Sequence, residues 1–303
     1  MKYAARRLLH GLMVVFMVVT LSFFLVRLTG DPVALIAGSE ATEQQIQTIQ
    51  RALNLDKPPW LQYVIYIQDV LHGDFGQSFF TSLPAMTMVL QTLPNSIVLT
   101  LVAFALAVVA ALPIGILSAA RPDSPADWAA RFLSVLGQCT PVFWLGILMI
   151  ILFSVTLRWL PFGGAGSWRH LVMPGLTLSA VAVPVVVQVT RSALLEALHQ
   201  DYLRTARAKG LMEWQVLLKH ALRNASIPVV TVIGVRLGFI IGGAVVTETV
   251  FSYPGLGRLA VQAVNYRDFP VIQALLVIVS SAVVSINLML DWLYAVLDPR
   301  VRS

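Results

Sequence analysis

The sequence predicts an all-α integral membrane protein with six transmembrane helices. Hydrophobic residues make up 57% of the 303 residues, whereas charged residues make up only 12%. The mean hydropathy is +0.79. Long stretches carry no charged side chain, namely 8–26, 75–120, 132–157, 170–190 and 269–290. Because about 20 apolar residues in a helix cross a ~30 Å hydrocarbon core, runs of this length indicate membrane spans.

We expect six spans, at about 8–28, 95–119, 132–157, 172–195, 227–249 and 271–297. Residues 1–28 then form the N-terminal segment and first span, residues 29–94 a cap, and residues 95–303 the core transmembrane domain. Lys2, Arg6 and Arg7 precede the first apolar run, as in a signal peptide. The run is longer than a signal core and no small-x-small cleavage site follows it, so we expect a retained anchor.

The 29–94 segment is predicted to be a small folded cap between spans 1 and 2. Apolar residues recur at helical spacing in 41–54 and again in 60–67. The simple interpretation is a lid over the helix bundle. The functional alternative adds contact with a partner on that side of the membrane.

The third predicted span contains a polar patch beside a proline, formed by Gln138, Thr140 and Pro141. An interrupted helix is tolerated at membrane depth only against protein or water. We therefore expect this patch to face the bundle interior, where it would line any polar passage between the helices. Cys139 is the only cysteine and excludes a disulfide within the chain.

The fifth predicted span combines small residues with a cation. Gly234, Gly238 and Gly242 recur every four residues, which favours close helix packing. Arg236 is too costly to face lipid, so this helix is expected at the centre of the bundle. The arginine either pairs with a neighbouring group or lines the passage. Glu248, near the end of this span, is a further candidate for the path, and the alternative is a helix-capping role.

The basic residues are distributed asymmetrically. Thirteen of the 21 lie in segments that share one side if the N-terminus is cytoplasmic, whereas the 29–94 segment has two basic residues and six acidic ones. The positive-inside rule then places both termini and the 198–224 loop in the cytoplasm, and the cap outside. The net charge of +6 reflects this topology, and we expect no nucleic-acid partner.

Motifs for enzyme chemistry are absent from the sequence. It contains no G-x-x-x-x-G-K-[ST] phosphate loop, no H-E-x-x-H, and no carboxylate pair at metal-ligand spacing. We therefore expect no catalytic residues, no metal site and no cofactor bound by this chain. An intramembrane protease is a remote possibility for such a membrane protein, and a scaffold or receptor is another.

The most specific signal is the 198–224 loop, which is basic and amphipathic and lies between two apolar runs. It resembles the cytoplasmic "EAA" loop of ABC-importer permeases, in the R-T-A-R-A-K-G form of the dipeptide, oligopeptide and nickel branch. Aligned on Gly210, the E-A-A triplet falls on Arg204, Thr205 and Ala206, so the acid that names the motif is replaced. Further matching motifs are Gly30-Asp31-Pro32, Gly73-Asp74-Phe75-Gly76-Gln77-Ser78, Arg191-Ser192, Val250-Phe251-Ser252-Tyr253-Pro254-Gly255-Leu256-Gly257-Arg258-Leu259, Arg267-Asp268-Phe269-Pro270-Val271-Ile272-Gln273 and Leu297-Asp298-Pro299-Arg300.

The resemblance implies the type I importer permease fold and a transporter subunit of the bacterial inner membrane. It implies that the loop couples the chain to ATPase subunits through Tyr202, Arg204, Thr205, Ala206, Arg207, Ala208, Lys209, Gly210 and Leu211. Implied partners are a second homologous permease, two ATP-binding subunits that carry ATP and Mg²⁺, and an extracytoplasmic substrate-binding protein. Short peptides are the favoured substrate. Glutathione and nickel or a metallophore stay open, because selectivity rests largely with the binding protein.

Overall fold

The computed structural model describes residues 2–29, 33, 42–52 and 54–297. Two of the matching motifs, Gly30-Asp31-Pro32 and most of Leu297-Asp298-Pro299-Arg300, lie outside the described residues. Within the described part the chain is helical and has no strand, only one isolated bridge between Gln77 and Pro84. The all-α prediction is therefore confirmed.

The helices follow one another along the whole chain. In order they are α1 (Lys2–Thr29), α3 (Glu43–Ala52), α4 (Pro59–Leu71), α5 (Ala85–Ala120), α6 (Pro125–Cys139), α7 (Val142–Met149), the π-helix η1 (Ile150–Thr156), α8 (Arg169–Ser179), α9 (Val183–Leu198), α10 (Asp201–Ala208), α11 (Glu213–Gln215), the π-helix η2 (Val216–Ala221), α12 (Leu222–Val250), α13 (Leu256–Asn265) and α14 (Phe269–Leu297).

Four stretches are long and apolar enough to cross a membrane as continuous helices: Arg6–Arg27, Ala85–Ala120, Glu213–Arg236 and Phe269–Trp292. Two bent pairs pass the same test together. They are Pro125–Cys139 with Val142–Thr156, bent by 104°, and Arg169–Ser179 with Val183–Leu198, bent by 53°. With each pair taken as one span the number is six, which agrees with the predicted number by length and composition. The fifth span differs in position, since the stretch Glu213–Arg236 begins and ends before the expected 227–249.

The first bend follows from a proline. Pro141 disfavours the helical conformation at the residue before it, and Thr140 is extended, with φ −84° and ψ 120°. The predicted interruption of the third span is therefore present. The second bend lies at 180–182, inside a span expected to be continuous. Pro184 lies in the first turn of α9, directly after this bend. Proline is favoured at the start of a helix because its missing N–H costs no helical hydrogen bond there.

The chain forms two compact units. The first comprises Met1–Leu93 and Leu259–Met289, and the second Pro94–Arg258 and Leu290–Ser303. α5 runs without a break through the expected boundary between cap and core at 94/95.

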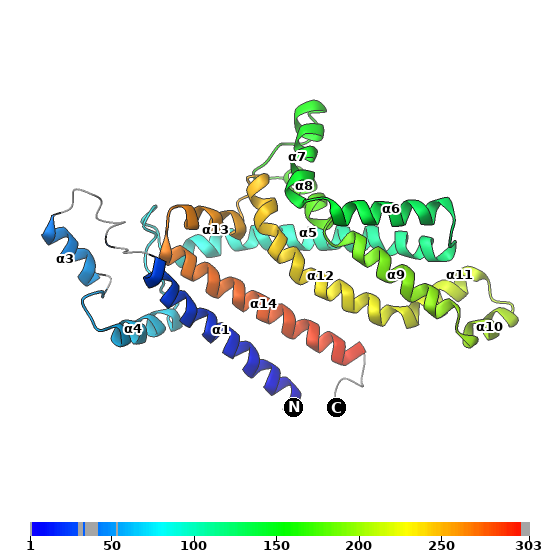
Figure 1. Cartoon of the computed structure of the whole chain (residues 1–303), viewed down its shortest axis with the longest axis horizontal. Helices are drawn as coiled ribbons and strands as arrows, with labels where there is room; N and C mark the ends of the chain where they lie inside the picture. Colours follow the sequence, from blue (N-terminus) through cyan, green and yellow to red (C-terminus); the bar gives the residue numbers. More distant parts are fainter. Residues whose placement is uncertain (1, 30–32, 34–41, 53, 298–303) are drawn as a thin grey trace. The chain divides into compact units, whose positions relative to one another are not determined.

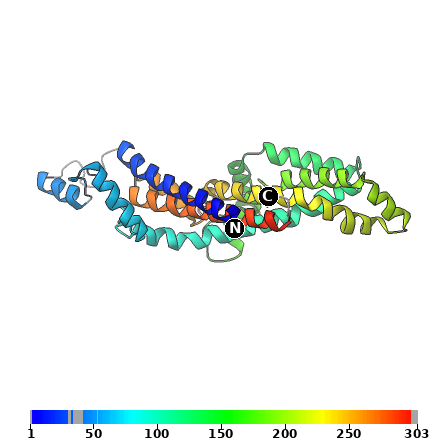
Figure 2. The same ribbon diagram turned by 90° about the horizontal axis from the view of Figure 1, so that it is seen from below.

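In the first unit, α1 and α14 lie side by side (Figures 1 and 2). A Cβ on Gly11 of α1 would lie 2.6 Å from Val284 of α14, so the two backbones approach closely. α4 is attached to α1 by polar contacts as well as by rings. Arg27 donates to the side-chain oxygen of Gln62 at 2.5 Å, and the hydroxyls of Ser22 and Tyr66 are 3.0 Å apart.

In the second unit, α9 packs against both α6 and α12, as Figure 1 shows. A buried cluster joins α5, α8, α12 and the turn after α12, with Leu99, Ala103, Leu178, Ile240, Ala244 and Tyr253 among its members. Gly115 allows α5 to approach α9, because a Cβ there would lie 2.7 Å from Thr190. Small side chains thus set the helix spacing in this unit.

Candidate functional site

The loop between α9 and α12 is a short helix anchored on the second unit. In α10, Leu203 and Ala206 are buried, three residues apart and therefore on one face. They join a cluster that contains Leu194, Val216, Ala221 and Ala225, and Leu211 packs beside it. The opposite face carries the exposed residues Tyr202, Arg204, Thr205, Arg207 and Ala208, followed by exposed Lys209 and Gly210.

The residues of the loop differ in their exposure. The Ala206 side chain, which the resemblance places in the coupling loop, faces the protein's own core. Leu211 and Leu217 pack against the buried cluster, whereas Trp214 and Leu218 are 60% and 47% exposed. The period of the helix decides these positions, because Leu203 and Ala206 occupy the inward face.

The turn after α10 requires glycine. Gly210 has φ +77°, a left-handed backbone that other residues adopt at a cost, and its N–H donates to the carbonyl of Arg207 at 2.9 Å. A Cβ at this position would meet nothing within 4 Å in this chain. The demand for glycine therefore comes from the backbone angle, and space next to the turn stays open for a partner.

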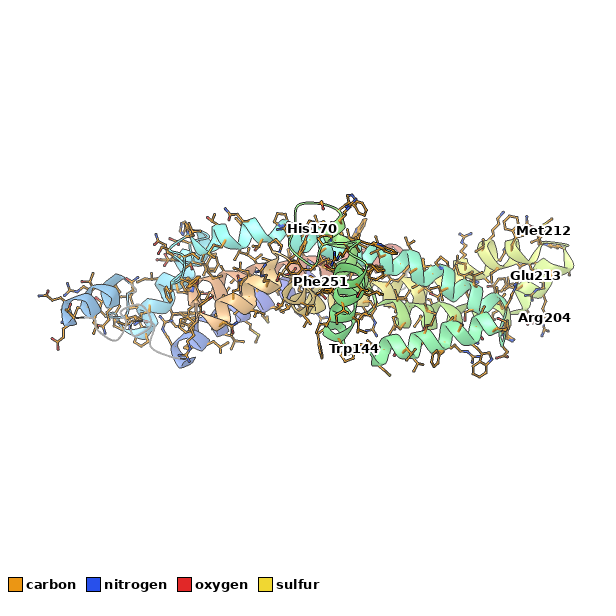
Figure 3. All side chains as sticks on the ribbon, turned by 90° about the horizontal axis from the view of Figure 1, so that it is seen from above. Trp144, His170, Arg204, Met212, Glu213 and Phe251 are labelled. Atoms are coloured by element: carbon orange, nitrogen blue, oxygen red, sulfur yellow. The ribbon has the colours of Figure 1, made fainter. Side chains whose placement is uncertain are left out.

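The charged residues of α10 have partners within the loop. The guanidinium of Arg207 lies 2.8 Å from a carboxylate oxygen of Glu213, and Arg204 lies 3.6 Å from Asp201. Figure 3 shows Arg204, Met212 and Glu213 together at the end of this loop. Sequence reasoning missed Glu213 and Asp201. Their spacing of six and three residues from the arginines was the available signal.

A buried ion pair, also missed, ties three helices together beside this loop. Asp127 of α6 is fully buried and accepts two hydrogen bonds from Arg191 of α9, at 2.7 and 2.8 Å. It also accepts from the Ser118 hydroxyl at the end of α5 and from the Asp123 N–H. The available signal was Ser124, which caps α6 by accepting from the Asp127 N–H at 3.2 Å.

Glu248 lies in a closed structural site. It is 0% exposed, and its carboxylate accepts from the Ser96 hydroxyl at 2.6 Å and from the Gly257 N–H at 2.7 Å. The Arg258 N–H lies at 3.2 Å. These amides belong to the first turn of α13, where a carboxylate is favoured by the helix dipole. Glu248 therefore takes the capping role that was its alternative.

Two of the residues expected in the path lie together with Arg236. Gln138, Thr140 and Arg236 line one hollow of about 290 Å³ in the second unit. Pro141 is not among the lining residues. It is exposed and occupies the position before α7.

The three glycines of α12 that recur every four residues differ in their surroundings. Gly234 is buried, whereas Gly238 and Gly242 are exposed and a Cβ on either would meet nothing within 4 Å in this chain. Among the described residues, Gly238 and Gly242 therefore lie close to no other helix of this subunit.

Among the described residues no group of three or more His, Cys, Asp or Glu has the arrangement to hold a metal ion. Cys139 is exposed and is a free thiol.

Comparison with known proteins identifies related sequences along the whole chain. Residues 111–303 match the family model "Binding-protein-dependent transport system inner membrane component", and residues 1–103 match the model of the N-terminal part of such membrane components. A protein of Sinorhizobium fredii named "Probable peptide ABC transporter permease protein y4tP" is 41% identical over 309 residues, with 99% of each chain covered. The "Glutathione transport system permease protein GsiC" of Escherichia coli is 42% identical, with 100% of this chain and 99% of that protein covered.

Among solved structures, the fold is similar to a chain of the MetNI methionine ABC transporter in an inward facing conformation. The TM-score is 0.58 at 21% identity, over 70% of this chain and 97% of that chain. This likeness concerns the fold.

Proposed function

We propose that this chain, which belongs to the binding-protein-dependent transport system inner membrane component family, forms half of the translocation pathway of an ATP-driven importer. Its role is that of a membrane permease that carries no catalytic centre. ATP and Mg²⁺ bind to separate ATPase subunits, and substrate arrives on an extracytoplasmic binding protein.

The observation that carries the proposal is the construction of the α10 loop. An importer must convert closure of its ATPase subunits into movement of the membrane helices. α10 suits that task because its inner face is fixed by Leu203 and Ala206 while its outer face is exposed and charged. The buried partners lie in α9, η2 and α12, so a push on α10 is transmitted to two membrane helices.

The neighbouring ion pair supports the same task. Asp127 and Arg191 connect α6 with α9 close to the end of α9 from which α10 follows. Paired and hydrogen-bonded charges inside a protein hold a defined geometry, since separating them leaves an uncompensated buried charge. α5, α6 and α9 are therefore joined where the chain leaves the bundle for α10.

We infer that the substrates are short peptides. The relatives of similar length carry names that refer to peptides and to glutathione, and glutathione is itself built from three amino acids. Glutathione is therefore the nearest alternative, with nickel or a metallophore as a further one.

The orientation in the inner membrane follows from the positive-inside rule, with both termini and the 198–224 loop in the cytoplasm. The second permease needed to complete the pathway is a homologous chain. The exposed glycines Gly238 and Gly242 on α12 offer a close-packing surface for it.

The decisive experiment is reconstitution of this chain with the second permease, the ATPase pair and the binding protein in proteoliposomes. ATP-dependent uptake of a labelled tripeptide or of glutathione is expected only with all components present. Omission of this chain should abolish both uptake and the stimulation of ATP hydrolysis by loaded binding protein. Uptake or stimulation of equal size without this chain would refute the proposal.

A further inference from the structure

Both bent helix pairs of the second unit break at the same place. The 104° bend between α6 and α7 contributes Gln138, Thr140 and Val142 to the hollow of about 290 Å³, and the 53° bend between α8 and α9 contributes Ala180. Arg236 of α12 completes its wall. Helix breaks at membrane depth persist only against protein or water, and in transporters broken helices surround binding sites.

The first break presents the positive end of a helix to the hollow. α7 begins at Val142, and no side chain caps it, because Pro141 at the N-cap offers no acceptor. The nearby Thr140 hydroxyl donates to the carbonyl of Leu136 at 2.7 Å. Amide groups in the first turn of a helix carry partial positive charge and attract anions.

Two side chains add donors to the same wall. Arg236 is the charged residue among those that line the hollow, and its guanidinium stays protonated and has a geometry that matches a carboxylate. Thr177 of α8 also lines the hollow. It is 1% exposed, and its Oγ1 has no hydrogen-bond partner among the described residues. A buried hydroxyl without a partner costs free energy, which a ligand oxygen would recover.

We propose that this hollow is a transient binding site for a carboxylate group of the substrate as it passes through the permease. The site consists of the Arg236 guanidinium, the amides at the start of α7 and the Thr177 hydroxyl. Its volume lies near the lower end of the ~300–1,000 Å³ typical of small-molecule sites, so it holds one end of a peptide. This inference rests on the proposed importer function and specifies what the path recognises.

A single anion site fits a passage better than a deep pocket would. Conduction requires a site that binds well enough to admit the substrate and weakly enough to release it. Free peptides and glutathione carry at least one carboxylate, whereas C-terminal amides lack that charge. The site thus favours free acids whatever the side chains of the peptide.

The electrostatic part can be tested without transport. In the assembled importer in nanodiscs, Cys139→Ser removes the native thiol and Gln138→Cys places a reporter thiol on the wall of the hollow. The rates of modification by an anionic sulfonatoethyl and a cationic trimethylammonioethyl methanethiosulfonate are then compared. Adding Arg236→Gln should lower the anionic-to-cationic rate ratio by roughly fivefold or more, since a nearby cation raises the local concentration of anions.

The matched controls are Arg236→Lys, which keeps the charge, and Arg223→Gln, which removes an exposed cation from the same helix. Both should leave the rate ratio within twofold of the parent on the same basis. An unchanged ratio in Arg236→Gln would overturn the proposal, because the guanidinium would then not act on the hollow.

The Thr177 contribution is tested by uptake of glutathione. Thr177→Val replaces the hydroxyl by a methyl of similar size, so assembly and ATPase attachment should be retained while KM for uptake rises severalfold. Wild-type KM would exclude Thr177 from the site, and this variant also decides the matter if Arg236→Gln fails to assemble.

If the parent importer takes up neither glutathione nor Ala-Ala-Ala with ATP, the importer function itself fails. If the parent importer takes up these substrates, but Thr177→Val keeps the parental KM and Arg236→Gln keeps the parental rate ratio, only the carboxylate site is refuted.

Discussion

The guanidinium of Arg191 and the carboxylate of Asp127 meet through two hydrogen bonds of 2.7 and 2.8 Å, across the interface between α9 and α6. Asp127 is fully buried, and the side chain of Arg191 is 19% exposed. The pair fixes the two helices in one geometry beside the α10 loop. Removal of the pair should therefore lower the stability of the folded chain.

Asp127→Ala is expected to destabilise the detergent-solubilised chain by about 3 kcal/mol, because it leaves the Arg191 charge without its partner. The measurement is thermal unfolding followed by circular dichroism. Asp123→Asn is the matched control, since Asp123 is a neighbouring carboxylate whose side chain is 83% exposed. It should change stability by less than about 0.5 kcal/mol. Equal effects of the two substitutions would show that the buried pair is not a structural joint.

Gly255→Ala is expected to disrupt the turn between α12 and α13. A Cβ on Gly255 would overlap the carboxyl group of Glu248, which is held by Ser96 and the start of α13. We expect a loss of about 2 kcal/mol or more in the solubilised chain, as for other overpacked sites. Gly238→Ala is the control, because its Cβ would meet nothing within 4 Å and alanine favours a helix. A Gly255→Ala protein as stable as the parent would contradict the tight closure around Glu248.

The sequence indicates the helices well, because spans are encoded by local composition. Charge-free runs mark α1, α5 and α14, and Pro141 marks the break before α7 by a local steric effect. The second bend lies at residues 180–182, which are Ala-Val-Ala, and its only local signal is Pro184 in the first turn of α9, which our interpretation of the sequence left unused. The bend was therefore not predicted, although it contributes to the hollow.

Contacts between distant residues were the least predictable part of the candidate sites. Glu248 looked like a path residue because it is an acid in an apolar run, but Ser96 and Gly257 close around it. The pairing of Asp127 could not be predicted from its local sequence, because its partner Arg191 lies 64 residues away. The sequence indicates a polar residue at membrane depth at each of Gln138, Thr140 and Arg236 but not that they meet. The fold brings all three to one hollow.

The orientation of the chain is expected to place reporter fusions after residue 303 and within 198–224 in the cytoplasm, and a fusion near residue 60 outside. The reason is the excess of basic residues in the segments assigned to the cytoplasm. Paired alkaline phosphatase and fluorescent-protein fusions at each site report the two sides with opposite signals. An outside signal for the 198–224 loop would contradict the coupling role of α10.

Arg207→Glu should weaken attachment of the ATPase pair about fivefold at most, since an exposed ion pair is worth ~1 kcal/mol or less. In this structure the partner of Arg207 is Glu213, at 2.8 Å within the loop. The exchange Arg207→Glu with Glu213→Arg restores opposite charges at these positions, and we expect it to recover attachment to within about twofold. Binding is measured by titration of the ATPase pair onto nanodisc-bound complexes. If the ATPase pair binds the doubly exchanged protein as weakly as it binds the Arg207→Glu protein, the ATPase interacts directly with the Arg207 charge.

Gly210 is the position at which we expect the largest functional effect. Its φ of +77° requires a left-handed backbone, which costs a residue with a Cβ roughly 1–2 kcal/mol, and the open space beside it is where a partner would lie. Gly210→Leu should therefore abolish uptake while the protein inserts with normal topology. Gly210→Asp should abolish uptake because it places a negative charge beside the partner surface, whereas Gly210→Asn should keep partial activity because asparagine tolerates this conformation and adds no charge.

The matched control is Gly76→Leu, since Gly76 has φ +79° and equally open surroundings but lies in the first unit. Gly76→Leu should keep ATPase attachment and the Gly210→Leu protein should lose it, as measured by pull-down of the ATPase pair and by stimulated ATP hydrolysis in reconstituted complexes. Parental coupling in the Gly210→Leu complex would show that force is not transmitted through this turn, and the coupling role of α10 would be refuted.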